Sequence, residues 1–149
     1  MLGMFTRRYA VKWVLICLCA FLVGCESSGG GGGTTPGDSP SIVESFTCRD
    51  VDAQSRPTGI TDVFFPSLDE RIYVWARWEN VDGSHTAHVE WYDPSGDKDY
   101  ESDESFTSSS GEQITWFYVS PAGMSVGRWE VELWLDGVFQ RSHFFVVEE

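Results

Sequence analysis

The chain has 149 residues, with 23 acidic and 10 basic side chains, a net charge of −13, and seven tryptophans. This length is too short for most two-domain enzymes, and the acidity excludes nucleic acid as a partner that binds by releasing counterions. Four cysteines are too few for a disulfide scaffold.

The first 24 residues have the pattern of a secretory signal peptide. Arg7, Arg8 and Lys12 precede an uncharged run over residues 13–23. These 11 residues are about half of the roughly 20 that a membrane-spanning helix needs. We therefore expect residues 1–24 to be cleaved from the mature protein.

The cleavage region, Leu22-Val23-Gly24-Cys25, places an aliphatic residue and two small or slender residues before a cysteine. This motif resembles the lipobox of bacterial lipoproteins. The resemblance implies that Cys25 carries a diacylglycerol, begins the mature chain and gains an amide-linked acyl chain of the palmitate type. Two or more chains hold a protein stably on a membrane, since each buried methylene contributes about 0.8 kcal/mol. The alternative is an ordinary signal peptide in which Gly24-Cys25 occurs by chance.

Residues 25–41 follow as a lipidated cysteine and a linker that includes five consecutive glycines. The segment has no apolar side chain to bury, so we expect a disordered chain with an end-to-end distance of roughly 20 Å. Glu26 stands where aspartate is the inner-membrane retention signal of enteric-type bacteria. The resemblance therefore implies an outer-membrane protein that faces the periplasm or the surface, or, in an organism with one membrane, the outer face of that membrane.

Removal of the signal peptide leaves seven basic side chains against 23 acidic ones, a net charge of −16. Such a chain is soluble and repels nucleic acids and anionic lipid headgroups. Cys48 is then the one cysteine without a lipid, and no nucleophile signature surrounds it. We expect a half-buried structural cysteine near a strand end.

From residue 42 onward, short runs alternate apolar and polar side chains between turn residues, which is the period of half-buried strands. Asp136-Gly137 between two such runs predicts a type I′ hairpin. The strands are expected at 42–48, 61–65, 71–79, 87–91, 100–106, 113–119, 128–135 and 138–147. Seven or eight strands at this spacing predict one all-β domain over 42–149, an antiparallel β-sandwich.

Four segments carry a second resemblance: Trp91-Tyr92-Asp93-Pro94-Ser95-Gly96, Gly127-Arg128-Trp129-Glu130-Val131, Asp136-Gly137 and Phe144-Phe145-Val146-Val147. Their layout resembles bacterial immunoglobulin-like or fibronectin-III-like modules over about residues 60–149. The resemblance implies an immunoglobulin-like sandwich and leaves activity open, because this architecture carries adhesive, ligand-binding and structural roles. Without the cysteine pair of antibody domains, aromatic side chains must hold the core.

Acidic and histidine side chains raise the question of a metal or a catalytic centre. Six acidic side chains within 12 residues offer the oxygen ligands that Ca²⁺ prefers, but their spacing matches no EF-hand loop: Asp93, Asp97, Asp99, Glu101, Asp103 and Glu104. We expect a solvated hairpin tip there and no cofactor, with a Ca²⁺ site as the alternative. His85 and His88 lie three apart, so a strand sends them to opposite faces where they cannot share a metal.

The remaining candidates have simpler explanations. His143 is isolated from the other histidines in the sequence. Glu130 and Glu132 share a strand face about 7 Å apart, which invites comparison with glycosidase carboxylates. On an outward face they are more simply the polar half of an amphipathic strand.

Outward-facing aromatic rings are the better lead to function. Tyr73, Trp75 and Trp134 alternate with the core residues of their strands, and exposed rings anchor protein interfaces and stack on sugars. The alternative is that a loop or the second sheet covers them. We expect a non-catalytic, membrane-tethered envelope lipoprotein that presents a binding or structural module to an envelope protein or glycan. The rivals are a carbohydrate-binding module with a row of exposed rings and a small envelope enzyme that uses acidic residues.

Overall fold

The computed structural model describes residues 39–149, which form an all-β domain. The predicted signal peptide, the lipobox residues Leu22, Val23, Gly24 and Cys25, and most of the linker lie outside the described residues. Over residues 39–149, no helix combines the length and the hydropathy needed to cross a membrane.

The described residues contain nine strands, one or two more than the sequence predicts. They are β1 (Ser41–Val51), β2 (Pro57–Ile60), β3 (Val63–Phe64), β4 (Ile72–Glu79), β5 (Gly83–Tyr92), β6 (Lys98–Ser108), β7 (Glu112–Val119), β8 (Gly127–Leu135) and β9 (Val138–Val147). The expected strand over 61–65 shortens to the two residues of β3. The additional strand, β2, escapes prediction because Pro57-Thr58-Gly59-Ile60 shows no apolar alternation.

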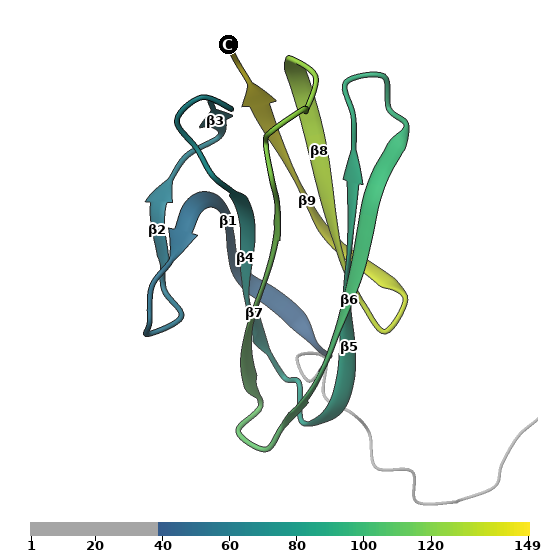
Figure 1. The fold of residues 1–149 in the computed structure, drawn as a ribbon. Coiled ribbons are helices and arrows are strands. Elements are labelled where there is room, and N and C mark those ends of the chain that lie inside the picture. The colour runs from purple at the N-terminus through teal and green to yellow at the C-terminus, as the bar shows by residue number, and fades with distance from the viewer. Residues whose placement is uncertain (1–38) are drawn as a thin grey trace, which may run out of the picture. The chain divides into compact units, whose positions relative to one another are not determined.

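The strands form two sheets that pack face to face as a β-sandwich (Figure 1). The four-stranded sheet has the order β2-β1-β4-β7, and the five-stranded sheet has the order β3-β9-β8-β5-β6. Pairing is antiparallel except between β3 and β9, which run parallel. The predicted sandwich is therefore confirmed, with this one parallel pair as a correction to a purely antiparallel fold.

Aromatic side chains fill the space between the sheets, as the lack of a disulfide requires. The expected inward face of β4 is confirmed, since all four of its side chains are buried: Ile72, Val74, Ala76 and Trp78. The Phe145 ring packs edge-on against Trp91 at 5.8 Å and stacks on Trp129 at 6.3 Å between ring centroids. Full burial of one such ring contributes a few kcal/mol, so these contacts hold the core together.

Two turns show how local sequence sets the strand ends. Asp136 and Gly137 have φ values of 49° and 77°, the paired positive angles of the predicted type I′ hairpin. Gly127 has a φ of 139°, and a Cβ atom there would lie 2.9 Å from Cγ of Pro94. Glycine is therefore required where the start of β8 passes the turn between β5 and β6.

The two long sides of the sandwich differ. On one side, β1 and β9 of opposite sheets lie close together. On the other side, β6 and β7 are the free edge strands of their sheets, joined by the turn over residues 109–111. At this second side, the inward-facing side chains of β6 and the outward-facing side chains of β7 are both in contact with solvent. The candidate site lies there.

Candidate functional site

Tyr73 and Trp75 face outward from β4, as the sequence predicts, but they are covered. Their exposed fractions are 7% and 4%. The Trp75 Nε1–H donates a hydrogen bond of 2.8 Å to the Ser55 carbonyl, and the Phe46 ring stacks on the indole at 6.1 Å. The turn between β1 and β2 thus covers Trp75, which is the alternative of a covering loop, while Tyr73 packs in a buried cluster with Cys48 and Trp75. Neither ring is available to a binding surface.

Trp134, the third predicted ring, is half-buried on the outward face of the five-stranded sheet. It packs edge-on against Phe139 with 5.4 Å between ring centroids, and Phe139 is itself 48% exposed. Trp134 also lines a shallow hollow of about 460 Å³ beside His88 and Glu90. This ring remains available for contact with a partner.

Three other rings form a more exposed group on the open side of the sandwich. Tyr100 of β6 and Trp116 and Tyr118 of β7 have exposed fractions of 47%, 38% and 49%. They line a hollow of about 370 Å³ between the two edge strands. We call this hollow the edge groove, and it is lined by Tyr100, Ser102, Asp103, Glu104, Trp116, Phe117 and Tyr118.

A second hollow of about 480 Å³ adjoins the edge groove and extends toward the turn that covers Trp75. Trp116 and Glu104 line both hollows, so one indole ring stands between two open concavities. An extended ligand could therefore contact this ring and continue on both sides of it.

One ring of the groove, Tyr118, is held in place by its neighbours. The Arg71 guanidinium lies over the Tyr118 ring at 4.4 Å and donates a hydrogen bond of 3.0 Å to the Tyr73 hydroxyl. The Tyr73 and Tyr118 rings are 5.4 Å apart. Because the buried Tyr73 and the cation fix it, Tyr118 loses little side-chain freedom when a ligand binds.

The polar groups of the groove are acidic. Asp103 and Glu104 lie beside the exposed rings, and burial raises the pKa of the Glu104 carboxyl above its usual range. In the adjoining hollow, Arg77 is held by Glu44 at 3.1 Å and Glu79 at 2.9 Å. The surface offers stacking rings and hydrogen-bond acceptors, and it disfavours an anionic ligand.

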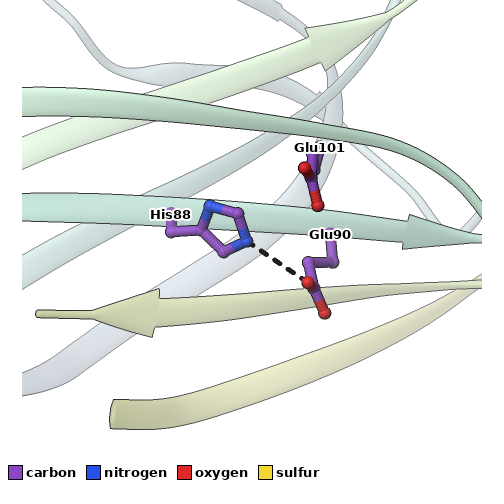
Figure 2. Close-up of side chains that lie close together, drawn as sticks. All are labelled: His88, Glu90 and Glu101. Carbon is purple, nitrogen blue, oxygen red and sulfur yellow. Dashed lines mark ion pairs between the residues drawn. The ribbon is translucent and has the colours of Figure 1, made fainter. Parts of the chain in front are cut away.

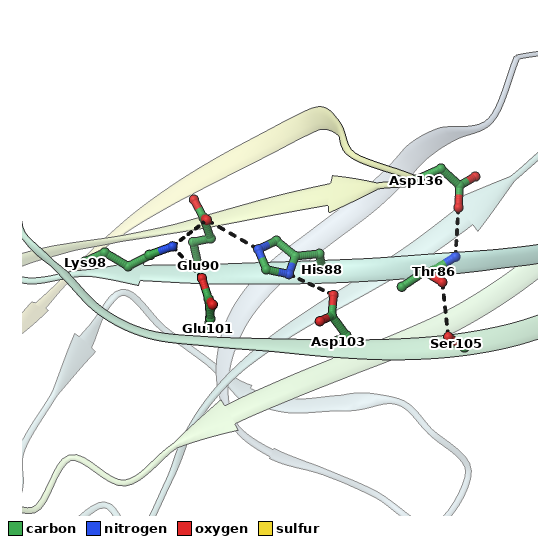
Figure 3. A network of polar contacts seen from close by, with 8 residues as sticks. All are labelled: Thr86, His88, Glu90, Lys98, Glu101, Asp103, Ser105 and Asp136. Atoms are coloured by element: carbon green, nitrogen blue, oxygen red, sulfur yellow. Dashed lines mark hydrogen bonds and ion pairs between the residues drawn. The ribbon is translucent and has the colours of Figure 1, made fainter.

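A separate polar network covers the outward face of β5 and β6. The side chains of His88, Glu90 and Glu101 converge there, with His88 Nε2 3.4 Å from a Glu90 oxygen (Figure 2). His88 Nδ1 lies 2.9 Å from Asp103, and the Lys98 ammonium bridges Glu90, at 3.1 Å, and Glu101 (Figure 3).

The network shifts the pKa values of its members. The Tyr92 hydroxyl donates to Glu90, which lowers the pKa of the Glu90 carboxyl and raises the pKa of Tyr92 to about 12. Burial lowers the pKa of His88, but hydrogen bonds to Asp103 and Glu90 outweigh burial and raise the pKa overall. Ion pairs and hydrogen bonds thus join the polar side chains of this face into one network.

Asp93, Asp97 and Asp99, the alternative Ca²⁺ ligands, do not converge in the same way. Asp93 Oδ1 accepts hydrogen bonds from the backbone N–H groups of Ser95 and Asp97, so this carboxylate caps the turn. Asp93 and Asp99 line a small hollow that Asp97 does not reach. Among residues 39–149, the group of His, Cys, Asp and Glu side chains with metal-sized spacing is His88, Glu90 and Glu101 instead.

The two neighbouring histidines have separate partners, as predicted. His85 Nδ1 lies 2.7 Å from Asp136, while His88 contacts Asp103 and Glu90. His143 is separate from the other histidines in the sequence, and in the structure its Nε2 lies 2.6 Å from the Ser45 Oγ. These residues are 98 positions apart, and the contact forms where β9 passes β1.

The Ser45–His143 pair has the chemistry of a nucleophile and its base but not the surroundings. Ser45 is buried, and the Arg141 guanidinium approaches its Oγ at 3.4 Å. Burial and the Arg141 charge lower the pKa of His143, so the imidazole is neutral. A buried hydroxyl beside a guanidinium favours a structural link between the sheets over acyl transfer.

Two further expectations are refined by the structure. Glu130 and Glu132 alternate with buried residues on β8, and Glu132 lies opposite Glu90 on β5. Burial and the charges of Glu130 and Glu90 raise the pKa of Glu132.

Cys48 is completely buried, not half-buried as expected, because it packs with Tyr73 and Trp75.

Comparison of the chain with known protein families and with curated proteins finds no match to either.

Proposed function

We propose that this protein is a non-catalytic, lipid-tethered envelope protein whose β-sandwich binds a partner through the edge groove. The observation that carries the proposal is the group of three exposed rings, Tyr100, Trp116 and Tyr118, around one hollow. Large exposed rings that are held in place are the usual anchors of binding surfaces. The predicted lipid on Cys25 would keep this surface close to the membrane from which partners are recruited.

The strand order supports an immunoglobulin-like or fibronectin-III-like module, the family that the sequence motifs resemble. The order β9-β8-β5-β6 corresponds to the G-F-C-C′ order of immunoglobulin-type sheets. Under this correspondence, β6 and β7 are edge strands, which leaves the groove between them open. Such modules carry their binding sites at positions that differ from one protein to the next, so the site itself must supply the evidence.

An uncharged glycan is the ligand class that the groove favours over a protein. Trp116 and Tyr118 lie two residues apart on one face of β7, where successive rings can stack on successive sugars. Ser102 and Glu104 beside them can bond sugar hydroxyl groups. The acidity of the groove and the net charge of −16 expected for the mature chain exclude strongly anionic polysaccharides.

A glycan array read beside a pull-down from envelope extracts tests the proposal. The variant is Trp116→Ala, and the matched control is Phe144→Ala, which removes a ring of 48% exposure from the other sheet. We expect wild type and Phe144→Ala to bind the same glycan or protein, and Trp116→Ala to lose at least about fivefold in affinity, since stacking contributes about 1–3 kcal/mol per ring. Equal binding by all three proteins would exclude the groove as the site.

The lipid anchor has its own test. Mass spectrometry of the mature N-terminus is expected to show Cys25 as the first residue, with the added mass of a diacylglycerol and one further acyl chain. An unmodified Cys25 would rule out the lipoprotein proposal and leave the binding proposal unaffected.

A further inference from the structure

The side chains of His88, Glu90 and Glu101 bring three potential metal ligands together on the outward face of the five-stranded sheet. His88 and Glu90 lie two residues apart on β5, and Glu101 pairs with Glu90 across β6. One nitrogen and two carboxylate oxygens lie within 4.8 Å of one another, as Figure 2 shows. Small side-chain rotations would place each of these atoms roughly 2.0–2.2 Å from a Zn²⁺ ion between them, which is the ligand distance that zinc requires.

The orientation of His88 sets this group apart from a cluster of carboxylates. Its Nδ1 lies 2.9 Å from Asp103 Oδ1, and its Nε2 faces the Glu90 carboxylate at 3.4 Å. When metal binding releases the proton on Nε2, the Nδ1–H bond to Asp103 fixes the tautomer and leaves the lone pair on Nε2. Histidines that bind metals have this arrangement, in which the carboxylate also raises the basicity of the ligand.

A cation already sits among these ligands, as Figure 3 shows. The Lys98 ammonium lies 3.1 Å from Glu90 and pairs with Glu101. Lys98 is 43% exposed, so its long side chain can turn away into solvent. Its single charge leaves an excess of carboxyl groups on this face, since Asp103 lies beside His88 and Glu132 lies opposite Glu90.

We propose that His88, Glu90 and Glu101 form a Zn²⁺ site in which the metal replaces the Lys98 ammonium. The ligands are His88 Nε2 and one oxygen from each glutamate, with water in the fourth position. Asp103 acts on the metal through His88, as a positioning residue. An imidazole with two carboxylates suits Zn²⁺ better than Ca²⁺ or Mg²⁺, which prefer six or more oxygen ligands.

The sequence spacing alone could not reveal this group. Glu101 lies 13 residues after His88, and only the register of β5 with β6 places it opposite Glu90. Asp103 both lines the edge groove and contacts His88, but the proposed metal ligands are not the rings that carry the proposed function. The metal site can therefore be tested independently of the proposed function.

Isothermal titration of the detergent-purified chain with ZnCl₂ tests the proposal. We expect micromolar binding by wild type and no binding at this site in His88→Ala. His85→Ala is the matched control, because it removes a histidine of the same strand whose partner is Asp136, and it is expected to bind as wild type does. Any thiol that binds zinc is common to all these proteins, so the differences between them report the site.

Two further variants sharpen the test. Lys98→Met is expected to bind Zn²⁺ about fivefold more tightly, because no ammonium has to be displaced. Asp103→Asn is expected to bind it about tenfold more weakly, as the loss of a carboxylate behind a ligating histidine does. The proposal is overturned if His88→Ala binds Zn²⁺ as wild type does, or if CaCl₂ binds as tightly as ZnCl₂ with no dependence on His88.

Discussion

The outward face of the four-stranded sheet carries two pairs of aromatic side chains in adjacent strands. Tyr73 and Trp75 of β4 are covered, whereas Tyr118 and Trp116 lie directly opposite them on β7 and remain exposed. The difference arises because β4 is an inner strand, with Trp75 covered by the turn between β1 and β2, whereas β7 is the edge of the sheet. Rings with the same pattern in the sequence therefore stabilise the fold in one strand and offer a binding surface in the next.

The largest expected difference between the two pairs is in stability. Trp75→Ala empties a covered site and loses the bond to the Ser55 carbonyl, so we expect a loss of about 3–5 kcal/mol in the free energy of unfolding. Trp116→Ala removes a partly solvated ring and is expected to cost about 1 kcal/mol or less. Urea denaturation followed by circular dichroism measures both values. Equal losses would show that the covered and exposed regions do not differ as described.

Cys48 packs with Tyr73 and Trp75 and provides a second test of the covered region. Cys48→Ser places a hydroxyl where the structure shows complete burial, and we expect a loss of about 1–3 kcal/mol in the free energy of unfolding. Burial also raises the pKa of the thiol to about 11, so the folded protein should not react with a maleimide at this residue. Peptide mass spectrometry after labelling, with and without urea, checks this. Labelling of Cys48 in the folded state would contradict the proposed cover.

Two half-buried histidines with different surroundings are expected to give opposite pH dependence, with the smallest expected effect. Burial, with the Arg141 charge, lowers the pKa of His143, which faces Ser45. Its contribution to stability is complete above the unfolded value of about 6.5 and is lost as the pH falls toward the folded value. Hydrogen bonding to Asp136 raises the pKa of His85, whose contribution is complete below about 6.5 and is lost as the pH rises through the folded value.

NMR titration of the imidazole signals measures both pKa values. The variants His143→Gln and His85→Gln each lack one signal and so assign it. Urea denaturation at about pH 5.5 and 8 should show opposite pH trends for the two variants relative to wild type. The same trend in both would contradict the assigned surroundings.

Much of the fold follows from the sequence because alternation and turn residues are local signals. The strands over β4, β8 and β9 and the hairpin at Asp136-Gly137 are predicted with small errors at their ends. β2 is missed because its apolar and polar side chains do not alternate. Its pairing with β1 also includes Gly59, whose positive φ of 62° departs from an extended strand.

The candidate site follows from the sequence only in part. The alternation of β7 separates Trp116 and Tyr118 from Thr115 and Phe117, which are buried, so exposed rings on this strand could be expected. That β6 would bring Tyr100 beside them depends on the packing of two sheets, which no local pattern encodes. The contact of Ser45 with His143 and the covering of Trp75 by a turn 20 residues away are also long-range.

Hydroxyl-radical footprinting of the protein in intact envelopes and after purification tests the binding surface most directly, because it works whatever the chemical nature of the ligand. The account predicts that Tyr100, Trp116 and Tyr118 are protected in the envelope and become reactive in the purified protein. Phe139 and Phe144 of β9, which are exposed to a similar extent away from the groove, should react equally in both states. Equal labelling of the groove rings in both states, or protection of Phe139 and Phe144 instead, would contradict it.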